Sequence, residues 1–256
     1  MPQTIPQAVR ELCLAFPQSE ERTSHGMPDF KVAGKSFAYF TINHHGDGRV
    51  GLWLKAPEGA QQQFVSLDPD VYFVPQYVGP RGWLGIELNS DVSWDEVRAR
   101  VREAWETAAP KSLAAQLDKT PATRPPTRKM KPEEIDPWLG QRAGQLLSEL
   151  RKRCEGFPEV TEHRSFGAPV WKAGKKTFAC AHTGSGRIKL QTWVGVEQQA
   201  MLTDDPRYTI PMYVGNKGWI DLDIEDHVDW NEVDGLLDIS YRHFALKRML
   251  AALDKA

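Results

Sequence analysis

The sequence has little cysteine and no long apolar run. Three cysteines in 256 residues are an odd and sparse set, which excludes a disulfide-rich miniprotein and is typical of reduced thiols in the cytoplasm. No stretch approaches the roughly 20 apolar residues of a membrane-spanning helix. The N-terminus lacks the basic start and apolar block of a secretory signal. We therefore expect a cytoplasmic protein that does not enter a membrane.

The sequence also lacks a large excess of charge of either sign. The formal net charge is −2, with 41% hydrophobic and 26% charged residues, which is usual for a soluble globular protein. Residues 1–118 carry a net −4, residues 119–132 carry +5, and residues 133–256 carry −3. Because a strongly basic balance is the electrostatic mark of a nucleic-acid binder, any site for an anion must be a local patch.

An internal repeat dominates the chain. At an offset of 141, residues 16–38 match residues 157–179 at 10 of 23 positions. At an offset of 136, residues 72–97 match residues 208–233 at 11 of 26 positions, including Y-V-G-P-R-G-W over Y-V-G-N-K-G-W. A period this long indicates two whole domains rather than a solenoid.

A proline-rich, basic segment separates the two copies. Residues 120–137 contain five prolines, and proline favours extended backbone. We predict copy 1 over residues 1–118, a semi-rigid exposed linker over residues 119–136, and copy 2 over residues 137–256. The five positive charges of the linker are interpreted as solvated, and an arm for nucleic acid or for an acidic partner is the alternative.

The hydrophobic pattern predicts the same elements in both copies. Apolar residues at helical spacing predict a first helix, which in copy 2 starts behind Asp136-Pro137. A last helix begins at S-W-D-E (Ser93) or D-W-N-E (Asp229). The strands and short helix expected between them are Ser36 to Ile42, Arg49 to Lys55, Glu58 to Ser66 (helix), Val71 to Val74 and Trp83 to Leu88, with their counterparts in copy 2.

Tight turns between the strands predict antiparallel sheets and an α+β fold class. Each copy is expected to be a two-layer α/β sandwich in the order α-β-β(-β)-α-β-β-α. The optional further strand lies near Phe30 or Trp171.

The ordered motifs S-x-G-x-P-x-[FW]-K…K-x-F-A and Y-V-G-x-[RK]-G-W, with the final helix, resemble the MmcQ/YjbR-like family. Each copy is similar to the family over roughly a hundred residues. The resemblance implies an antiparallel sheet covered by helices, as in secretion-chaperone-like folds. Members are described as DNA-binding proteins, and the family offers no catalytic residues to transfer.

No pattern in the sequence predicts catalysis. The histidines are scattered and lack the close spacing of zinc ligands. Ser24 and Ser165 recur, but no histidine recurs as a base and no G-x-S-x-G elbow exists. The glycine-rich phosphate-binding patterns G-x-G-x-x-G and G-x-x-x-x-G-K-[ST] do not occur. We expect a non-enzymatic protein without a metal or cofactor.

Repeated basic residues on turns are the candidates for binding. They are Lys31, Lys35 and Arg81 in copy 1, and Lys172, Lys175, Lys176 and Lys217 in copy 2. Our leading hypothesis is that these residues contact the phosphates of duplex DNA without strong sequence readout. The alternatives are a protein-interaction or chaperone-like module, an acidic protein partner, a small anion bound between the copies, and a plain solvated hairpin.

Repeated aromatic residues flank the second pair of basic turns. Tyr77 and Trp83 in copy 1 match Tyr213 and Trp219 in copy 2. We expect these rings to pack the sheet against the helices, and a surface stacking platform is the alternative.

Overall fold

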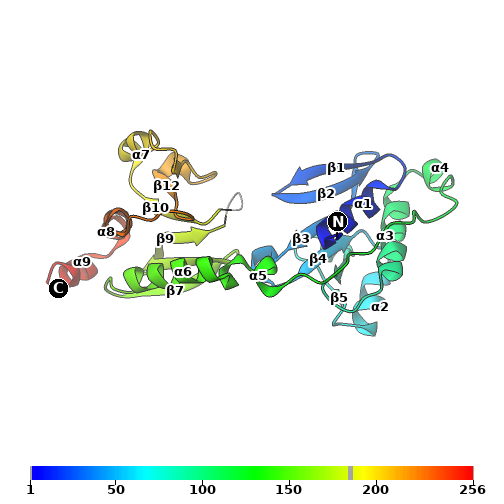
Figure 1. Ribbon diagram of the computed structural model, residues 1–256, viewed down its shortest axis with the longest axis horizontal. Helices are drawn as coiled ribbons and strands as arrows, with labels where there is room; N and C mark the ends of the chain where they lie inside the picture. The colour runs from blue at the N-terminus through cyan, green and yellow to red at the C-terminus, as the bar shows by residue number, and fades with distance from the viewer. Residues whose placement is uncertain (1, 184–186, 256) are drawn as a thin grey trace. The chain divides into compact units, whose positions relative to one another are not determined.

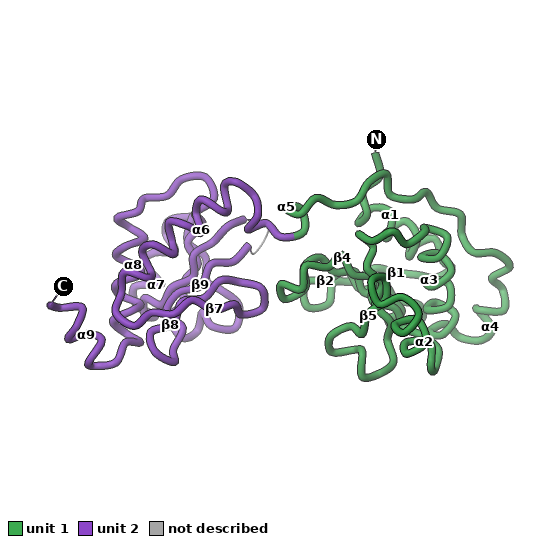
Figure 2. Tube along the Cα trace, turned by 90° about the horizontal axis from the view of Figure 1, so that it is seen from below, with its two compact units in different colours: residues 1–135 green, residues 136–256 purple. Residues whose placement is uncertain are grey.

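The computed structural model describes residues 2–183 and 187–255 and divides into two compact units. Unit 1 covers residues 1–135 and unit 2 covers residues 136–256 (Figure 2). Each unit holds one six-stranded sheet with helices. This confirms the predicted α+β class with two similar halves. Within the described residues, no helix has the length and apolar character needed to cross a membrane.

Unit 1 builds its sheet from four strands that precede the short helix α2 in the sequence and two that follow it (Figure 1). Its elements are α1 (Ile5–Leu14), β1 (Ser19–Ser24), β2 (Met27–Val32), β3 (Lys35–Ile42), η1 (His44–Gly46), β4 (Val50–Leu54), α2 (Ala60–Leu67), β5 (Tyr72–Phe73), η2 (Gly79–Arg81), β6 (Leu84–Glu87), α3 (Trp94–Ala108), α4 (Lys111–Ala114) and α5 (Pro132–Ile135). The strand order is β1-β2-β3-β4-β6-β5, and all neighbours are antiparallel.

Unit 2 repeats this topology. Its elements are η3 (Pro137–Leu139), α6 (Gln141–Cys154), β7 (Val160–Ser165), β8 (Ala168–Ala173), β9 (Lys176–His182), β10 (Lys189–Trp193), α7 (Val196–Leu202), β11 (Tyr208–Thr209), η5 (Gly215–Lys217), β12 (Trp219–Asp223), α8 (Trp230–Phe244) and α9 (Lys247–Leu253). The order β11-β12-β10-β9-β8-β7 is again antiparallel throughout.

The predicted apolar stripes form the core of each unit. In α1 the stripe buries Val9, Leu12 and Cys13, and in α3 it buries Val97, Val101 and Trp105. Phe16 stacks on Trp105 with ring centroids 5.6 Å apart, and Phe157 stacks on Tyr241 at 4.5 Å. Because burying each large apolar side chain stabilises the fold by about 1.5–3 kcal/mol, these stripes hold the helices against the sheets.

The first strand of each sheet was not predicted. β1 is S-E-E-R-T-S, and none of its residues is buried. β7 is V-T-E-H-R-S and is equally open. Both are edge strands, which pair with a neighbouring strand on one side only. Backbone hydrogen bonds to that neighbour hold them in the sheet, so they need no alternation of apolar and polar residues. The sheets therefore have six strands each, more than the four or five that we expected.

The first helix of copy 2 also begins later than predicted. The Asp136 side chain accepts a hydrogen bond from the Trp138 backbone N–H at 3.1 Å, but it caps the short 3₁₀ turn η3. The long helix α6 follows with Gly140 at its N-cap. Pro137 is thus the first residue of a separate turn that places the buried Trp138 against the core.

Residues 119–135, most of the segment that we predicted to be a semi-rigid exposed linker, pack against unit 1. The backbone N–H of Thr127 donates to the Gln3 carbonyl oxygen at 2.9 Å. Met130 donates its N–H to Asn89 Oδ1 at 2.6 Å and accepts from Asn89 Nδ2 at 3.1 Å. The Met130 side chain also packs on the core. This segment is therefore attached to unit 1.

Two of the five basic residues in this segment form ion pairs. Both terminal nitrogens of Arg128 bond the Glu134 carboxylate, at 2.6 and 2.7 Å. Lys129 lies 2.6 Å from Asp91. Two of the five positive charges of the segment are thus matched by acidic side chains.

Candidate functional site

Tight hairpin turns place the repeated lysines at one end of each sheet. In unit 1 the turn is Ala33-Gly34, with φ of 48° and 75°, and in unit 2 Gly174 has a φ of 61°. Positive φ is what two-residue hairpin turns require. Lys35 follows the first turn, and Lys175 and Lys176 follow Gly174. These three lysines are exposed, whereas Lys31 and Lys172 are half-buried on the preceding strands.

Arg81 and Lys217 lie at the same sheet end as the lysine turns. They close the η2 and η5 turns, just before β6 and β12 begin, and both are exposed. The strand register brings the β2–β3 turn, the end of β4 and the start of β6 to one end. Since neighbouring strands lie about 4.8 Å apart, β3 and β6 are separated by roughly 10 Å. All seven predicted residues therefore lie at equivalent ends of the two sheets.

Most of these seven cations have no acidic partner. Lys31 Nζ lies 3.4 Å from Asp29 Oδ2, but in the described part of the chain the other six form no ion pair. Across the same residues thirteen of the seventeen arginines form ion pairs, whereas among the fifteen lysines only Lys31 and Lys129 do. The sheet ends thus carry positive charge that the chain itself does not neutralise.

The two copies differ in one buried residue beside the lysine turn. Asp29 is only 2% exposed and lies on β2 two residues before Lys31. The repeat places Val170 at the same position of β8, two residues before Lys172. Unit 2 therefore offers more unmatched positive charge than unit 1.

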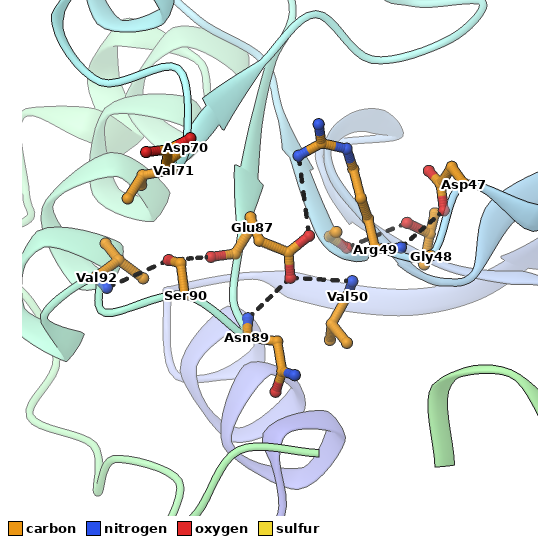
Figure 3. A network of polar contacts seen from close by, with 12 residues as sticks. Asp47, Gly48, Arg49, Val50, Asp70, Val71, Glu87, Asn89, Ser90 and Val92 are labelled. Atoms are coloured by element: carbon orange, nitrogen blue, oxygen red, sulfur yellow. Dashed lines mark hydrogen bonds and ion pairs between the residues drawn. The ribbon is translucent and has the colours of Figure 1, made fainter. Parts of the chain in front are cut away.

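The opposite sheet end of unit 1 also has a cation, but here a carboxylate matches it. Glu87 Oε1 accepts hydrogen bonds from the backbone N–H groups of Val50 at 3.2 Å and Asn89 at 2.9 Å (Figure 3). Arg49 lies 4.0 Å from its other oxygen. Burial raises the pKa of Glu87, although these contacts oppose the shift.

Unit 2 has a corresponding ion pair at that end. Arg187 hydrogen-bonds to Asp223 and also to Asp226, at 2.7 Å. The hydrogen bond from Arg187 lowers the pKa of Asp223. In both units, an arginine at this end is therefore paired with a carboxylate of the fold, unlike the unpaired cations at the lysine end.

A buried glutamine that we did not predict fixes the loop carrying Arg81 or Lys217. Gln61 Nε2 donates to the carbonyl oxygens of Gly79 at 2.8 Å and Trp83 at 2.5 Å. Gln199 makes the same two bonds, to Gly215 at 2.8 Å and Trp219 at 2.6 Å. Both glutamines are buried, at 7% and 6% exposure. The signal was present as a glutamine in both short helices, but the changing offset of the repeat concealed it.

The repeated aromatics divide into a packed and an exposed set. Trp83 is buried, with its ring 5.2 Å from that of Tyr39, and Trp219 stacks on Phe244 at 5.6 Å. Tyr77 and Tyr213 are instead 63% and 85% exposed. Trp219 thus packs the sheet against helix α8 as predicted, whereas Trp83 packs on a strand of its own sheet. For the tyrosines the packing prediction is wrong, because they stand on a loop outside the core.

The longer β3–β4 turn of unit 1 adds His44 and His45 near Tyr77. The Tyr77 hydroxyl lies 3.0 Å from His45 Nε2, and the His44 ring lies 4.8 Å from that of Trp53. Burial, with a smaller contribution from His45, lowers the pKa of His44 to about 4. His44 is therefore neutral near pH 7 and lines a pocket of about 410 Å³.

The cysteines are poorly suited to nucleophilic chemistry. Burial raises the pKa of Cys13 and Cys154 far above the usual thiol value, and it raises the pKa of Cys180 to about 12. Since the thiolate is the reactive form, these side chains act as small core residues. Across the described ranges, no cluster of three or more His, Cys, Asp or Glu residues could hold a metal ion.

Comparison with known proteins supports the duplicated architecture. The family model YjbR matches residues 14–107 and again residues 155–243. A crystal structure of a Deinococcus radiodurans protein with a DUF419 domain is similar at 19% identity and a TM-score of 0.36, over 42% of this chain and 87% of that chain. A search of curated proteins found no match. Since the two YjbR matches together cover well over half of the sequence, the chain belongs to the YjbR family and carries its domain twice.

Proposed function

We propose that the protein is a non-enzymatic nucleic-acid-binding protein of the cytoplasm, which contacts the phosphate backbone of DNA through the basic turns of both units. The observation that carries this proposal is the repeated set of unpaired cations at equivalent sheet ends. Exposed lysines are common on any protein. Five of the six unpaired cations stand at positions that the repeat matches between the two copies, and their recurrence at the same sheet end favours a shared anionic ligand.

Phosphate groups fit the chemistry of these turns. Lysine binds phosphate as a compact point charge, and such contacts position a protein on a nucleic acid without reading its sequence. The net charge of −2 gives no general attraction to a polyanion, so the local field must provide it. We therefore expect modest affinity that falls steeply with added salt. The raised pKa values of the thiols further favour a binding role over catalysis.

Charge reversal at the lysine turn of unit 2 tests the proposal. We expect the full-length variant Lys172→Glu, Lys175→Glu, Lys176→Glu to bind duplex DNA at least about tenfold more weakly than the wild type. The loss should be equal for every duplex sequence, because phosphate contacts carry no base information. Fluorescence anisotropy at about 20 mM salt, where screening is weakest, measures both quantities.

A matched variant separates local contact from net charge. Lys152, Lys247 and Lys255 are exposed residues of unit 2 that lie on or next to α6 and α9. Changing these three to glutamate alters the net charge equally and should reduce affinity much less. Equal losses in the two triple variants, or no binding by the wild type even at about 20 mM salt, would contradict the proposal.

An acidic protein partner is the second candidate. The same lysines can pair with carboxylates, and Ile210 and Met212 are 58% and 77% exposed on the loop that leads to Lys217. Exposed apolar side chains beside charge are common at protein interfaces. This candidate predicts that a nucleic acid neither binds nor competes.

A further inference from the structure

The exposed tyrosine of each unit has an unusual backbone conformation. Tyr77 has a φ of 61° and Tyr213 a φ of 70°. In each loop the next residue donates its N–H back across the tyrosine, from Val78 to the Gln76 carbonyl at 2.6 Å and from Val214 to the Met212 carbonyl at 3.0 Å. These are features of a γ-turn with positive φ at its central residue, which is rare and strained. The strain is present in both copies.

Local packing accounts for the other repeated residues of this loop. Val74 and Ile210 lie directly over Gly79 and Gly215, where a Cβ atom would be 2.5 or 2.3 Å from their side chains. The buried glutamines hold the carbonyl groups of these glycines. The aliphatic side chains and glycines of the loop therefore close the turn.

The tyrosine ring of unit 2 has no comparable structural role. In the described part of the chain, the Tyr213 side chain makes no hydrogen bond or ring contact and is 85% exposed. Glycine would adopt its positive φ without a steric penalty. A strained, exposed aromatic residue that stabilises nothing visible in the fold points to a ligand contact.

We propose that Tyr213 and Tyr77 are stacking platforms for unpaired bases, so that the protein binds single-stranded nucleic acid more tightly than duplex. Each tyrosine shares its loop with an unpaired cation, Lys217 or Arg81, and neither loop contains an acidic residue. Proteins bind single strands through this combination of basic groups along the backbone and aromatic rings under the bases. Paired bases in a duplex do not expose their faces to such a ring. This inference rests on the proposed function and adds that the bases of the bound nucleic acid are unpaired.

The two platforms should differ in strength. The Tyr77 hydroxyl is 3.0 Å from His45 Nε2, and its ring meets those of His44 and His45 edge-on. Unit 2 has no histidine pair at the corresponding turn. Tyr213 is therefore more accessible and should contribute more to binding.

Full-length Tyr213→Ala tests the inference with an unstructured oligothymidine and a duplex of equal length. Stacking contributes about 1–3 kcal/mol per base, so we expect roughly fivefold to 150-fold weaker binding of the single strand. Duplex affinity should stay unchanged, and Tyr213→Phe should bind like the wild type. Met212→Ala, which removes the neighbouring exposed side chain, should also bind normally.

Stability measurements exclude a structural explanation. Tyr213→Gly should unfold at the same temperature as the wild type or higher, yet bind the single strand as weakly as Tyr213→Ala. Equal binding of the oligothymidine by wild type and Tyr213→Ala would overturn the inference, as would equal losses for single strand and duplex. If the wild type binds both ligands equally and only the lysine variants weaken them, the stacking inference fails while the proposed function stands. If the wild type binds neither the single strand nor the duplex, the proposed function is wrong and the stacking inference falls with it.

Discussion

One buried amide in each unit determines where the exposed side chains of the second basic loop lie. Gln61 and Gln199 each donate two hydrogen bonds to carbonyl groups of that loop, from inside the fold. A buried carbonyl that loses its donor retains its full desolvation cost. These residues position the loop and do not reach the proposed ligand.

Replacing Gln61 with leucine should therefore destabilise unit 1. Leucine fills a similar volume but leaves the Gly79 and Trp83 carbonyl groups without their donor, so we expect a loss of about 2–4 kcal/mol. Urea denaturation measures it. Gln62→Leu is the matched control, because Gln62 is exposed on the same helix and its loss should be within about 0.5 kcal/mol. Equal stability of the two variants would show that the glutamine bonds are unimportant.

At this scale the sequence predicted the positions of the lysines but not their surroundings. Repetition and turn chemistry located Lys35 and Lys176, since both depend on local spacing. The partnership of Lys31 with Asp29 depends on burial of Asp29 in the sheet, which spacing alone does not reveal. The exposure of Tyr77 and Tyr213 follows from a strained turn that no residue pattern signals.

Among the elements, the ends of the β4–β6 and β10–β12 ladders show how similar contacts respond differently to acid. Burial raises the pKa of Glu87, so the folded chain takes up its proton before the unfolded chain does. Its contribution to stability therefore rises as pH falls. Arg187 lowers the pKa of Asp223. The contribution of Asp223 to stability is therefore present above its pKa in the unfolded chain and is lost as the pH falls through its pKa in the folded chain.

Two amide substitutions should show these opposite signs. Relative to wild type, Glu87→Gln should raise the unfolding temperature more at pH 7 than at about pH 4, because it removes the cost of a buried charge. Asp223→Asn should lower the unfolding temperature at pH 7, and the loss should shrink toward about pH 3. Calorimetry of the full chain provides the comparison. The same pH trend in both variants would contradict these assignments.

The elements themselves were predictable where they were apolar and not where they were polar. Central strands and long helices follow from their alternation and stripes, as with Val97, Val101 and Trp105. The edge strand β1 contains no buried residue and is held by backbone pairing to β2, which leaves no hydrophobic pattern. α6 begins later than predicted because Asp136-Pro137 satisfies the rules for a cap, yet caps a separate 3₁₀ turn.

For the whole molecule, the duplication is what makes the proposed interface recognisable. The basic turns recur at the same sheet end in both units, and this recurrence distinguishes them from the other exposed lysines of the chain. The segment of residues 119–135, which composition alone described as an exposed linker with a basic arm as the alternative, is held to unit 1 through Met130 and Thr127. We therefore assign the proposed interface to the repeated sheet ends of the two units and not to this segment.

The salt dependence of DNA affinity, divided between the two copies, tests this account most directly. Three to five phosphate contacts predict a slope of log K against log salt of roughly −3 to −5. Changing Lys172, Lys175 and Lys176 to glutamine should reduce the magnitude by about 2 to 3, and changing Lys35 and Arg81 by about 1 to 2. The reductions should add when both sets are combined. A slope that stays unchanged when all five residues are neutralised would contradict the claim that the repeated turns bind the backbone.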